Sequence, residues 1–347
     1  TLDYVDGQWH LVTQHGDAEI FDIVISATGI LHHPSKPDIA GLDQFEGRCF
    51  HSAEWDMDAD LDGKRVGIIG TGSTSAQIVG AITDKVAKMD VFQRTPHWIA
   101  PLPQRAYSKF ERFMMRLLPF IPRMIYWANY TQFKMVFGPA TTGNKWAQKK
   151  ITDICNQHLE DAIEDPELRA KLTPSYQAAC KRLIFASDYY PAMQQDHANL
   201  ITQGITQIEP TGIRTEDGAL HELDVLILAT GFHVSSFILP TKVTGENGAD
   251  LGDFWGQAPR AHRGVAMPNF PNFWMLEGPT SPVGNLSLIM ISEHQVDYII
   301  SMLDAMQSRG ITTLAPKTEA YDRYNAAMSV RVKDTVWATG GCDSWYI

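Results

Sequence analysis

The chain has 347 residues, of which 44% are hydrophobic and 20% charged, a composition typical of a globular protein with a large core. Its formal net charge of −11 argues against a surface that binds nucleic acid. Four widely spaced cysteines, without a C-x-x-C pair, argue against a structural zinc site, a disulfide framework and a dithiol redox pair: Cys49, Cys155, Cys180 and Cys342. We therefore expect reduced thiols in a cytoplasmic protein.

The first 29 residues predict a hairpin followed by a buried strand. Asp6-Gly7 is a turn signal between two segments in which apolar residues alternate with other residues. The buried strand then ends in an A-T-G tripeptide at residues 27–29. Because a hairpin cannot bury a face alone, we expect the chain to open in mid-architecture, as if a preceding sheet were missing.

The stretch "FEGRCFHSAEW" places four residues at the offsets F-x-G-x-x-x-H-x-x-x-W: Phe45, Gly47, His51 and Trp55. Taken alone, this stretch could be an ordinary surface loop, since a histidine followed four residues later by a tryptophan is usually packing. The residues that follow it in the chain decide between these interpretations.

Residues 65–86 predict a strand, a tight glycine turn and a helix. An apolar run at 66–69 is followed by Gly70, Gly72 and Ser75 in a G-x-G-x-x-S pattern, and apolar residues then recur at helical spacing. Gly70 permits the turn, Gly72 lets the backbone approach a pyrophosphate, and Ser75 is small enough for close helix–strand packing. The free amides at the helix start would face the phosphates. The alternative is a tight turn without a ligand.

The next strand ends in Gln93-Arg94-Thr95, with no carboxylate at its tip. A turn that binds NAD expects an acidic residue about twenty positions after the glycines. A guanidinium and a hydroxyl suit the 2′-phosphate of NADP instead. We therefore expect NADP, and the alternative is that Arg94 is a solvated surface charge.

Residues 106–178 predict an inserted helical subdomain, since helical periodicity interrupts the α/β pattern there. Lys181 and Arg182 then precede an apolar stretch and a tyrosine pair. A second A-T-G tripeptide at 229–231 ends another buried strand, as expected where the chain crosses between two dinucleotide-binding domains. Gly284 and Asn285 lie in a loop before a long helix, whose start can hold an anion or can be simply capped.

In combination, these motifs resemble the class B flavoprotein monooxygenases. The long string at 45–55 resembles the fingerprint of type I Baeyer–Villiger monooxygenases, and "CKRLIFASDYYPAMQ" and "GPTSPVGN" look most like the branch that contains hydroxyacetophenone monooxygenase. The resemblance covers nearly the whole chain. Relatives begin with a FAD-binding G-x-G-x-x-G and continue past the last residue here. We therefore expect a FAD-binding domain that lacks its N-terminal motif and its C-terminal end.

The resemblance implies an α/β fold with two Rossmann-like dinucleotide-binding domains, the FAD one incomplete, and a helical insert. Residues 1–29 and 232–347 would belong to the FAD-binding domain, 30–105 and 179–231 to the NADP-binding domain, and 106–178 to the insert. It also implies roles for individual residues. Arg182 would be the catalytic arginine, and the fingerprint residues would couple domain movement to cofactor position. The cofactor-binding residues would be Gly70, Thr71, Gly72, Ser73, Ser75, Arg94, Thr95, Lys181, Gly284 and Asn285.

The implied reaction uses FAD, NADPH and O2 to insert one oxygen atom beside a ketone carbonyl through a peroxyflavin, giving an ester or lactone. Arg182 would stabilise the peroxide and the oxyanion of the adduct; the alternative is a structural ion pair. An apolar pocket lined by aromatics of the insert would select an aryl or long-chain ketone: Tyr126, Trp127, Tyr130 and Phe133. We expect no nucleic-acid partner and no membrane contact. Two other functions stay open: an N- or S-oxygenating monooxygenase, and a truncated, non-catalytic NADP-binding module.

Overall fold

The computed structural model describes residues 1–102, 105–281 and 287–346, and it divides into two compact units. The first unit comprises Thr1–His33, Phe232–Thr335 and Trp345–Ile347, and the second comprises Pro34–Gly231 and Val336–Ser344. The segment Val336–Ser344 thus packs with the second unit, although the sequence placed it with residues 232–347. Each unit is described by itself below.

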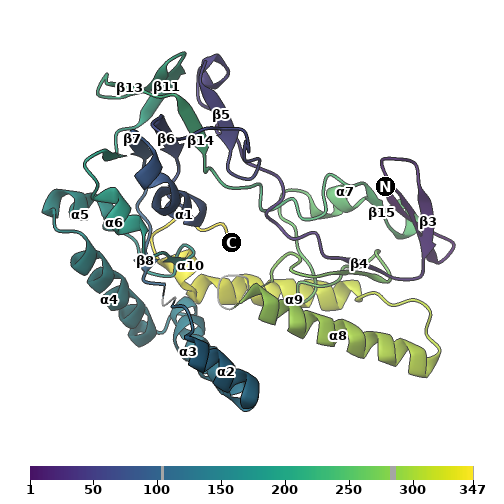
Figure 1. Ribbon diagram of the computed structural model, residues 1–347. Helices are drawn as coiled ribbons and strands as arrows, with labels where there is room; N and C mark the ends of the chain where they lie inside the picture. The colour runs from purple at the N-terminus through teal and green to yellow at the C-terminus, as the bar shows by residue number, and fades with distance from the viewer. Residues whose placement is uncertain (103–104, 282–286, 347) are drawn as a thin grey trace. The chain divides into compact units, whose positions relative to one another are not determined.

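The second unit is built on a five-stranded sheet in which every pair of neighbours is parallel (Figure 1). Its strands, in spatial order, are β10 (Ala198–Ile201), β7 (Lys88–Phe92), β6 (Arg65–Ile69), β14 (Val225–Leu228) and β5 (Arg48–His51). The central strands are short apolar runs because both of their faces are covered. This is the buried parallel sheet that the sequence predicts.

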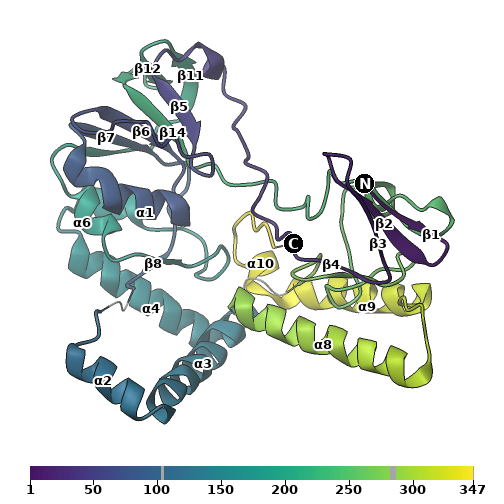
Figure 2. The same ribbon diagram turned by 45° about the vertical axis from the view of Figure 1, so that its right-hand side comes forward.

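The two faces of this sheet pack on different partners. Ile68 and Val91 lie in the cluster with helix α1 (Ser73–Ile82) and helix α6 (Tyr189–Met193). Ile69 and Phe92, each the next residue along its strand, lie in the cluster with strands β11 (Ile205–Glu209) and β12 (Gly212–Thr215). Strand β13 (Leu220–Glu222) pairs with β12, and this small sheet is antiparallel. The pleat sends successive side chains to opposite faces, and Figure 2 shows α1 and β11–β12 on opposite sides of the sheet.

The predicted insert is helical. It contains α2 (Lys109–Leu117), α3 (Phe120–Thr141), α4 (Lys145–Ala162) and α5 (Pro166–Leu172), with α3 and α4 packed side by side (Figure 1). Local signals set the starts: Ser108 and Glu111 form a capping box for α2, and Asp165 accepts from the amides of Glu167 and Leu168 at the start of α5. Two short parallel strands, β8 (Ile99–Ala100) and β9 (Ile184–Phe185), pair beside these helices.

The first unit contains the predicted hairpin, β1 (Leu2–Val5) and β2 (Gln8–Val12), whose turn residues Asp6 and Gly7 both have positive φ. The hairpin is completed by β3 (Ala18–Phe21) and by β15 (Val243–Thr244), so its partner strand comes from far along the chain. The remaining elements are a parallel pair, β4 (Val24–Ser26) and β16 (Phe273–Met275), and the helices α7 (Leu251–Trp255), α8 (Leu288–Arg309) and α9 (Thr318–Arg331). Within the described residues, four short 3₁₀ helices lie at Leu42–Gln44, Thr83–Lys85, Glu246–Gly248 and Val332–Asp334.

The expectation of four reduced thiols is wrong for two of them. Cys180 and Cys342 form a disulfide, while Cys49 and Cys155 are free. The two bonded residues are 162 positions apart, and the short helix α10 (Val336–Thr339) brings the second to the first. Sequence spacing therefore gave no sign of the pairing. Among the described residues, no helix combines the length and the apolarity needed to cross a lipid bilayer.

Candidate functional site

The predicted cofactor segments meet at one edge of the parallel sheet. In the strand register, Ile69 pairs with Phe92 and Leu228, and Leu228 pairs with His51. All four are the last residues of their strands, so the turns that follow them lie side by side at the carboxyl edge. Ligands of open α/β sheets bind at this edge. The structure thus brings together residues 70–75, 93–95 and 229–231.

The glycine turn after β6 has the geometry that the motif requires. Gly70 has φ +112°, and a Cβ there would overlap the carbonyl oxygen of Ala229. At Gly72, a Cβ would meet nothing within 4 Å, so there is open space in front of the helix start. Gly72 is the N-cap of α1 and provides no side-chain cap, which leaves the first amides of the helix without a side-chain partner. Ser75 is fully buried, as close packing of the helix requires.

A hydrogen bond ties this turn to the tip of β7. The Thr71 hydroxyl donates to the carbonyl oxygen of Thr95 at 2.8 Å. Both residues are half-buried. The bond fixes the spacing between the glycine turn and the Arg94-Thr95 tip. The sequence predicts that the turn binds the pyrophosphate of NADP and that the tip binds its 2′-phosphate.

Two cationic side chains gather beside that tip. Arg94 is exposed and Lys181 half-buried, and burial together with the charge of Arg94 lowers the pKa of Lys181, while the Asp343 carboxylate opposes this effect. Within the described parts of the chain, neither cation lies in an ion pair with a carboxylate. Two like charges near each other, neither of them in an ion pair, favour an anionic ligand.

His97 belongs to the same cluster, and the sequence analysis did not single it out. Burial and the nearby charge of Lys181 lower its pKa to about 4, so the imidazole is neutral at neutral pH. Its Nδ1 atom is buried and has no hydrogen-bond partner among the described residues. The only sequence signal was its place three residues after Arg94, which does not separate a site residue from a packing residue.

The segment that carries Lys181 and Arg182 is held by its aromatic neighbours. The Trp98 indole donates to the carbonyl oxygen of Tyr176 at 2.8 Å, and the Tyr176 hydroxyl donates to that of Pro96 at 3.1 Å. The Lys181 ammonium lies 5.5 Å from the centroid of the Tyr176 ring. Arg182 differs from Lys181 in burial: Arg182 is exposed, whereas Lys181 is half-buried. Its predicted position beside a flavin stays a prediction.

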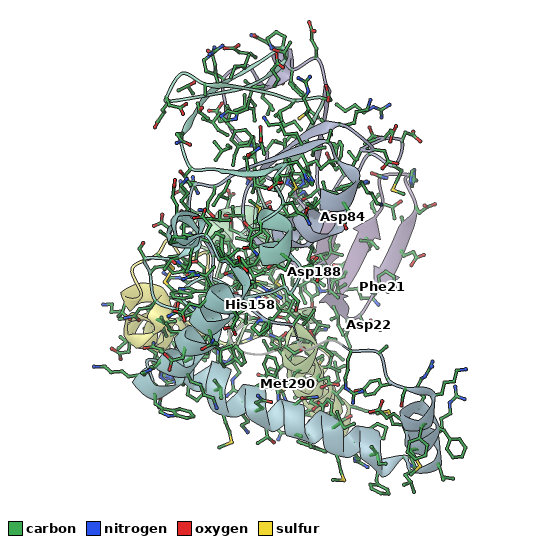
Figure 3. The ribbon with its side chains drawn as sticks, turned by 60° about the vertical axis from the view of Figure 1, so that its left-hand side comes forward. Phe21, Asp22, Asp84, His158, Asp188 and Met290 are labelled. Carbon is green, nitrogen blue, oxygen red and sulfur yellow. A yellow bond between two sulfur atoms is a disulfide. The ribbon has the colours of Figure 1, made fainter. Side chains whose placement is uncertain are left out.

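Helix α4 of the insert supports the strand that follows this pair. His158, labelled on α4 in Figure 3, makes a 3.1 Å hydrogen bond with the carbonyl oxygen of Ala186. Asp188, labelled just above it, lies so close to Gly80 that a Cβ there would approach its side chain within 2.9 Å. The insert is thereby coupled to α1 through residues 186–188.

The fingerprint residues pack within the second unit, and their role in coupling domain movement to cofactor position stays a prediction. Phe45 packs against the cluster on the sheet face that β11 and β12 cover. A Cβ at Gly47 would crowd both Phe45 and the carbonyl oxygen of Asp224, the latter at 2.5 Å. Trp55 stacks edge-on against Phe50 at 5.0 Å. His51 is 1% exposed; burial lowers its pKa, and a hydrogen bond with the Gly231 backbone partly offsets that effect. The fingerprint thus ties the end of β5 to the second A-T-G turn.

Two groups of predicted residues gain no support from the described structure. Gly284 and Asn285 lie outside the described residues. The aromatics of the insert expected to line a substrate pocket are mostly on the surface: Tyr126, Trp127 and Phe133 are 52%, 53% and 43% exposed. Their pocket role stays a prediction.

The donor set at the carboxyl edge fits NADP. Uncapped helix amides and the open space at Gly72 suit a pyrophosphate, and the Arg94–Lys181 pair suits a further phosphate at the far end of the nucleotide. No acidic side chain occupies the strand tip where the ribose hydroxyls of NAD would need one.

Comparisons with known proteins agree with this geometry. Residues 3–245 match the family described as flavin-binding monooxygenase-like. An uncharacterized monooxygenase of Mycobacterium tuberculosis is 42% identical over 342 residues, covering 99% of this chain and 68% of the relative. A Baeyer–Villiger monooxygenase of Streptomyces coelicolor is 38% identical over 344 residues, covering 98% and 65%. The crystal structure of OTEMO in complex with FAD and NADP superposes with a TM-score of 0.85 at 26% identity, covering 99% of this chain and 73% of that one.

This chain spans about two thirds of the length of these curated relatives. The matches confirm the resemblance drawn from the sequence and the α/β fold with its dinucleotide-binding domains. They also confirm, at the level of the family, the enzyme class, an FAD- and NADPH-dependent Baeyer–Villiger monooxygenase, and its two cofactors.

Proposed function

Because the chain belongs to the flavin-binding monooxygenase-like family, we propose that it serves in the oxidation of a ketone to an ester or lactone, with NADPH as reductant and O2 as oxidant. The observation that carries this proposal is the cationic pair of Arg94 and Lys181, which lies beside a glycine turn whose helix start has no side-chain cap. This arrangement supports NADPH as the electron source.

The residues at the carboxyl edge would bind and orient the nicotinamide nucleotide. The backbone at Gly70, Thr71, Gly72 and Ser73 would donate to the pyrophosphate, and Ser75 would let α1 start close to it. Arg94, Thr95 and Lys181 would hold the 2′-phosphate. Each hydrogen bond between a charged donor and a phosphate contributes about 1.5–3 kcal/mol, enough to choose NADPH over NADH.

When bound, FAD supplies the oxygen chemistry, which the resemblance assigns to a peroxyflavin. This chain would contribute the Arg182 guanidinium, which carries a permanent positive charge and five N–H donors. A fixed donor of this kind stabilises negative charge that develops on oxygen during attack on a carbonyl, and is typically worth about 3–4 kcal/mol. The exposed position of Arg182 leaves it free to meet a ligand.

The substrate class that we propose is an aryl or long-chain ketone, on the basis of the aromatic side chains of α3. Tyr126, Trp127 and Tyr130 contact one another, and Phe133 stacks on Phe137 at 4.7 Å. An apolar substrate would gain from burying such surface.

The proposal is tested by oxygen transfer in the FAD-loaded full-length enzyme. NADPH consumption should rise on addition of an aryl or long-chain ketone, and the product should be an ester that carries one oxygen atom from isotope-labelled O2. NADPH consumption without an oxygenated ketone product would contradict the proposal. An enzyme that oxygenates amines or sulfides but no ketone would also contradict it, and would favour the N- or S-oxygenating alternative.

A further inference from the structure

The disulfide joins two segments that lie next to the proposed phosphate site. Cys180 directly precedes Lys181, and Cys342 directly precedes Asp343. The Asp343 carboxylate raises the pKa of Lys181, so its negative charge lies near the Lys181 ammonium. The cross-link therefore does more than close a loop, because it holds residues 340–344 against the segment that carries Lys181.

Backbone contacts make the C-terminal segment a clamp on residues 176–182. The amide of Gln177 donates to the carbonyl oxygen of Gly340 at 2.9 Å, and the Ser344 hydroxyl donates to that of Cys180 at 3.1 Å. A Cβ at Gly340 would approach the Cys180 sulfur within 2.7 Å, so only glycine allows this approach. Val336 anchors the segment, since it is fully buried in the cluster that contains Trp98 and Tyr176.

The clamped segment has an unfavourable local conformation. Ala179 has φ +70°, a region that residues other than glycine rarely adopt. The next residue, Cys180, is fully buried and bonded. A backbone of this kind persists when its surroundings hold it. The hydrogen bonds and the cross-link from residues 340–344 provide that restraint immediately before Lys181.

We propose that residues 340–344, cross-linked through Cys342, position Lys181 for the 2′-phosphate, so that the affinity for this phosphate depends on the thiol–disulfide state of the Cys180–Cys342 pair. This inference rests on the proposed function, since it assumes that the cationic pair binds NADPH. Residues 340–344 act through Lys181 and are positioning residues. Arg94 comes from the tip of β7, outside the clamp, and keeps its own place.

The redox step is a two-electron exchange with a dithiol. The attacking thiolate bonds to the sulfur of Cys342, which is half-buried, and the Cys180 sulfur leaves and takes up a proton. The second thiol of the reductant then displaces the Cys342 sulfur, which is also protonated. The protein gains two thiols, and the dithiol becomes a disulfide. Residues 340–344 then lose the cross-link and keep only their hydrogen bonds and the buried Val336 anchor.

The test compares two small nucleotides that differ in the 2′-phosphate. Binding of 2′,5′-ADP and of 5′-AMP to the FAD-loaded full-length enzyme is measured by calorimetry before and after reduction with dithiothreitol, and thiol labelling verifies the state of the pair. Reduction should weaken 2′,5′-ADP binding about tenfold, and should leave 5′-AMP binding unchanged. Cys342→Ser should behave like the reduced enzyme under both conditions. Cys49→Ser, which removes an exposed free thiol, is the matched control and should behave like the wild type.

The outcomes separate the two proposals. If the oxidised enzyme prefers 2′,5′-ADP, and both the reduced enzyme and Cys342→Ser keep that preference, the clamp is overturned and the NADPH site stands. If reduction weakens both nucleotides equally, the segment supports the fold and does not position Lys181, which also overturns the clamp. If the oxidised enzyme has no preference for 2′,5′-ADP, the proposed NADPH site fails, and the clamp with it.

Discussion

The two sides of the cofactor edge are built in different ways. The glycine turn after β6 comes from six consecutive residues, and its φ angles and uncapped helix start follow from their spacing. The side that carries Lys181 is assembled from residues 94–98, 176–182 and 340–344, held together by a disulfide and by hydrogen bonds to backbone carbonyls. A phosphate site formed by backbone groups can therefore be predicted from one short stretch of sequence. A site formed by charged side chains depends on segments that are far apart in the sequence.

The largest expected effect is the loss of oxygen transfer in Arg182→Ala. Removing a donor that stabilises developing negative charge should lower kcat for ketone oxidation by about 10²–10³. Reduction of FAD by NADPH should stay close to the wild-type rate, since the NADPH contacts proposed here lie on other residues. Rapid-mixing absorbance separates the two steps.

Arg112→Ala, which removes an exposed arginine of α2, is the control for this prediction. If Arg182→Ala oxidises the ketone as fast as the Arg112→Ala control, Arg182 has no catalytic role.

The next effect separates the two glycines of the local turn. Gly70→Ala should lower the free energy of unfolding by about 1–3 kcal/mol, because its φ is positive and a Cβ would meet the Ala229 carbonyl. Gly72→Ala should leave stability nearly unchanged, because a Cβ there meets nothing, yet should weaken NADP binding by filling the space for the pyrophosphate. Denaturant unfolding and nucleotide titration of both variants give the two readouts.

Equal stability of the two glycine variants would show that the turn is not as constrained as its φ angles indicate. Unchanged NADP affinity in Gly72→Ala would place the pyrophosphate elsewhere.

On the side that carries Lys181, His97 should make the free energy of unfolding depend on pH. Its pKa is about 4 in the folded state and near 6.5 when unfolded, so the unfolded chain binds the proton more readily between these values. The stabilising effect of a neutral His97 is therefore present above pH 6.5 and falls as the pH drops toward 4. Between pH 6.5 and 5 the loss should be about 1–2 kcal/mol.

The measurement is denaturant unfolding from pH 7 to 5 in the wild type and in His97→Gln. The variant should lose less stability over that interval, because its amide does not titrate. Parallel stability curves would show that His97 makes no difference between the folded and unfolded states.

The smallest effect concerns Asp343, the exposed carboxylate whose charge raises the pKa of Lys181. Asp343→Asn removes a negative charge near the proposed phosphate, so 2′,5′-ADP should bind about two- to threefold more tightly, in line with the worth of an exposed charge interaction. Raising the salt concentration should reduce this gain. Weaker binding in Asp343→Asn would indicate that the carboxylate orders Lys181 more than it competes with the phosphate.

Much of the fold was predictable because its signals are local. The buried runs at 66–69 and 225–228 indicated buried strands, and Asp6-Gly7 indicated a hairpin turn. The long fingerprint indicated the family. Its own residues proved to pack within one unit, where His51 contacts the Gly231 backbone.

Other parts of the site were not predictable from spacing. The Cys180–Cys342 bond forms because α10 packs with the second unit, after about a hundred residues that belong to the first. No pattern in the sequence predicts that assignment. The perturbed imidazole of His97 depends on burial and on a lysine 84 positions away, neither of which is visible in the "TPHW" string. Both are consequences of tertiary packing.

We infer that the carboxyl edge of the parallel sheet selects NADP by charge at the tip of β7. This selection is tested most directly by the ratio of the dissociation constants of NADP and NAD, measured in the wild type and in Arg94→Ala. We predict that the wild type prefers NADP at least tenfold, as one charge-assisted phosphate contact allows. Arg94→Ala should lose most of that preference while binding NAD as before. A wild type that binds both nucleotides equally, or an Arg94→Ala variant that keeps the preference, would contradict the claim.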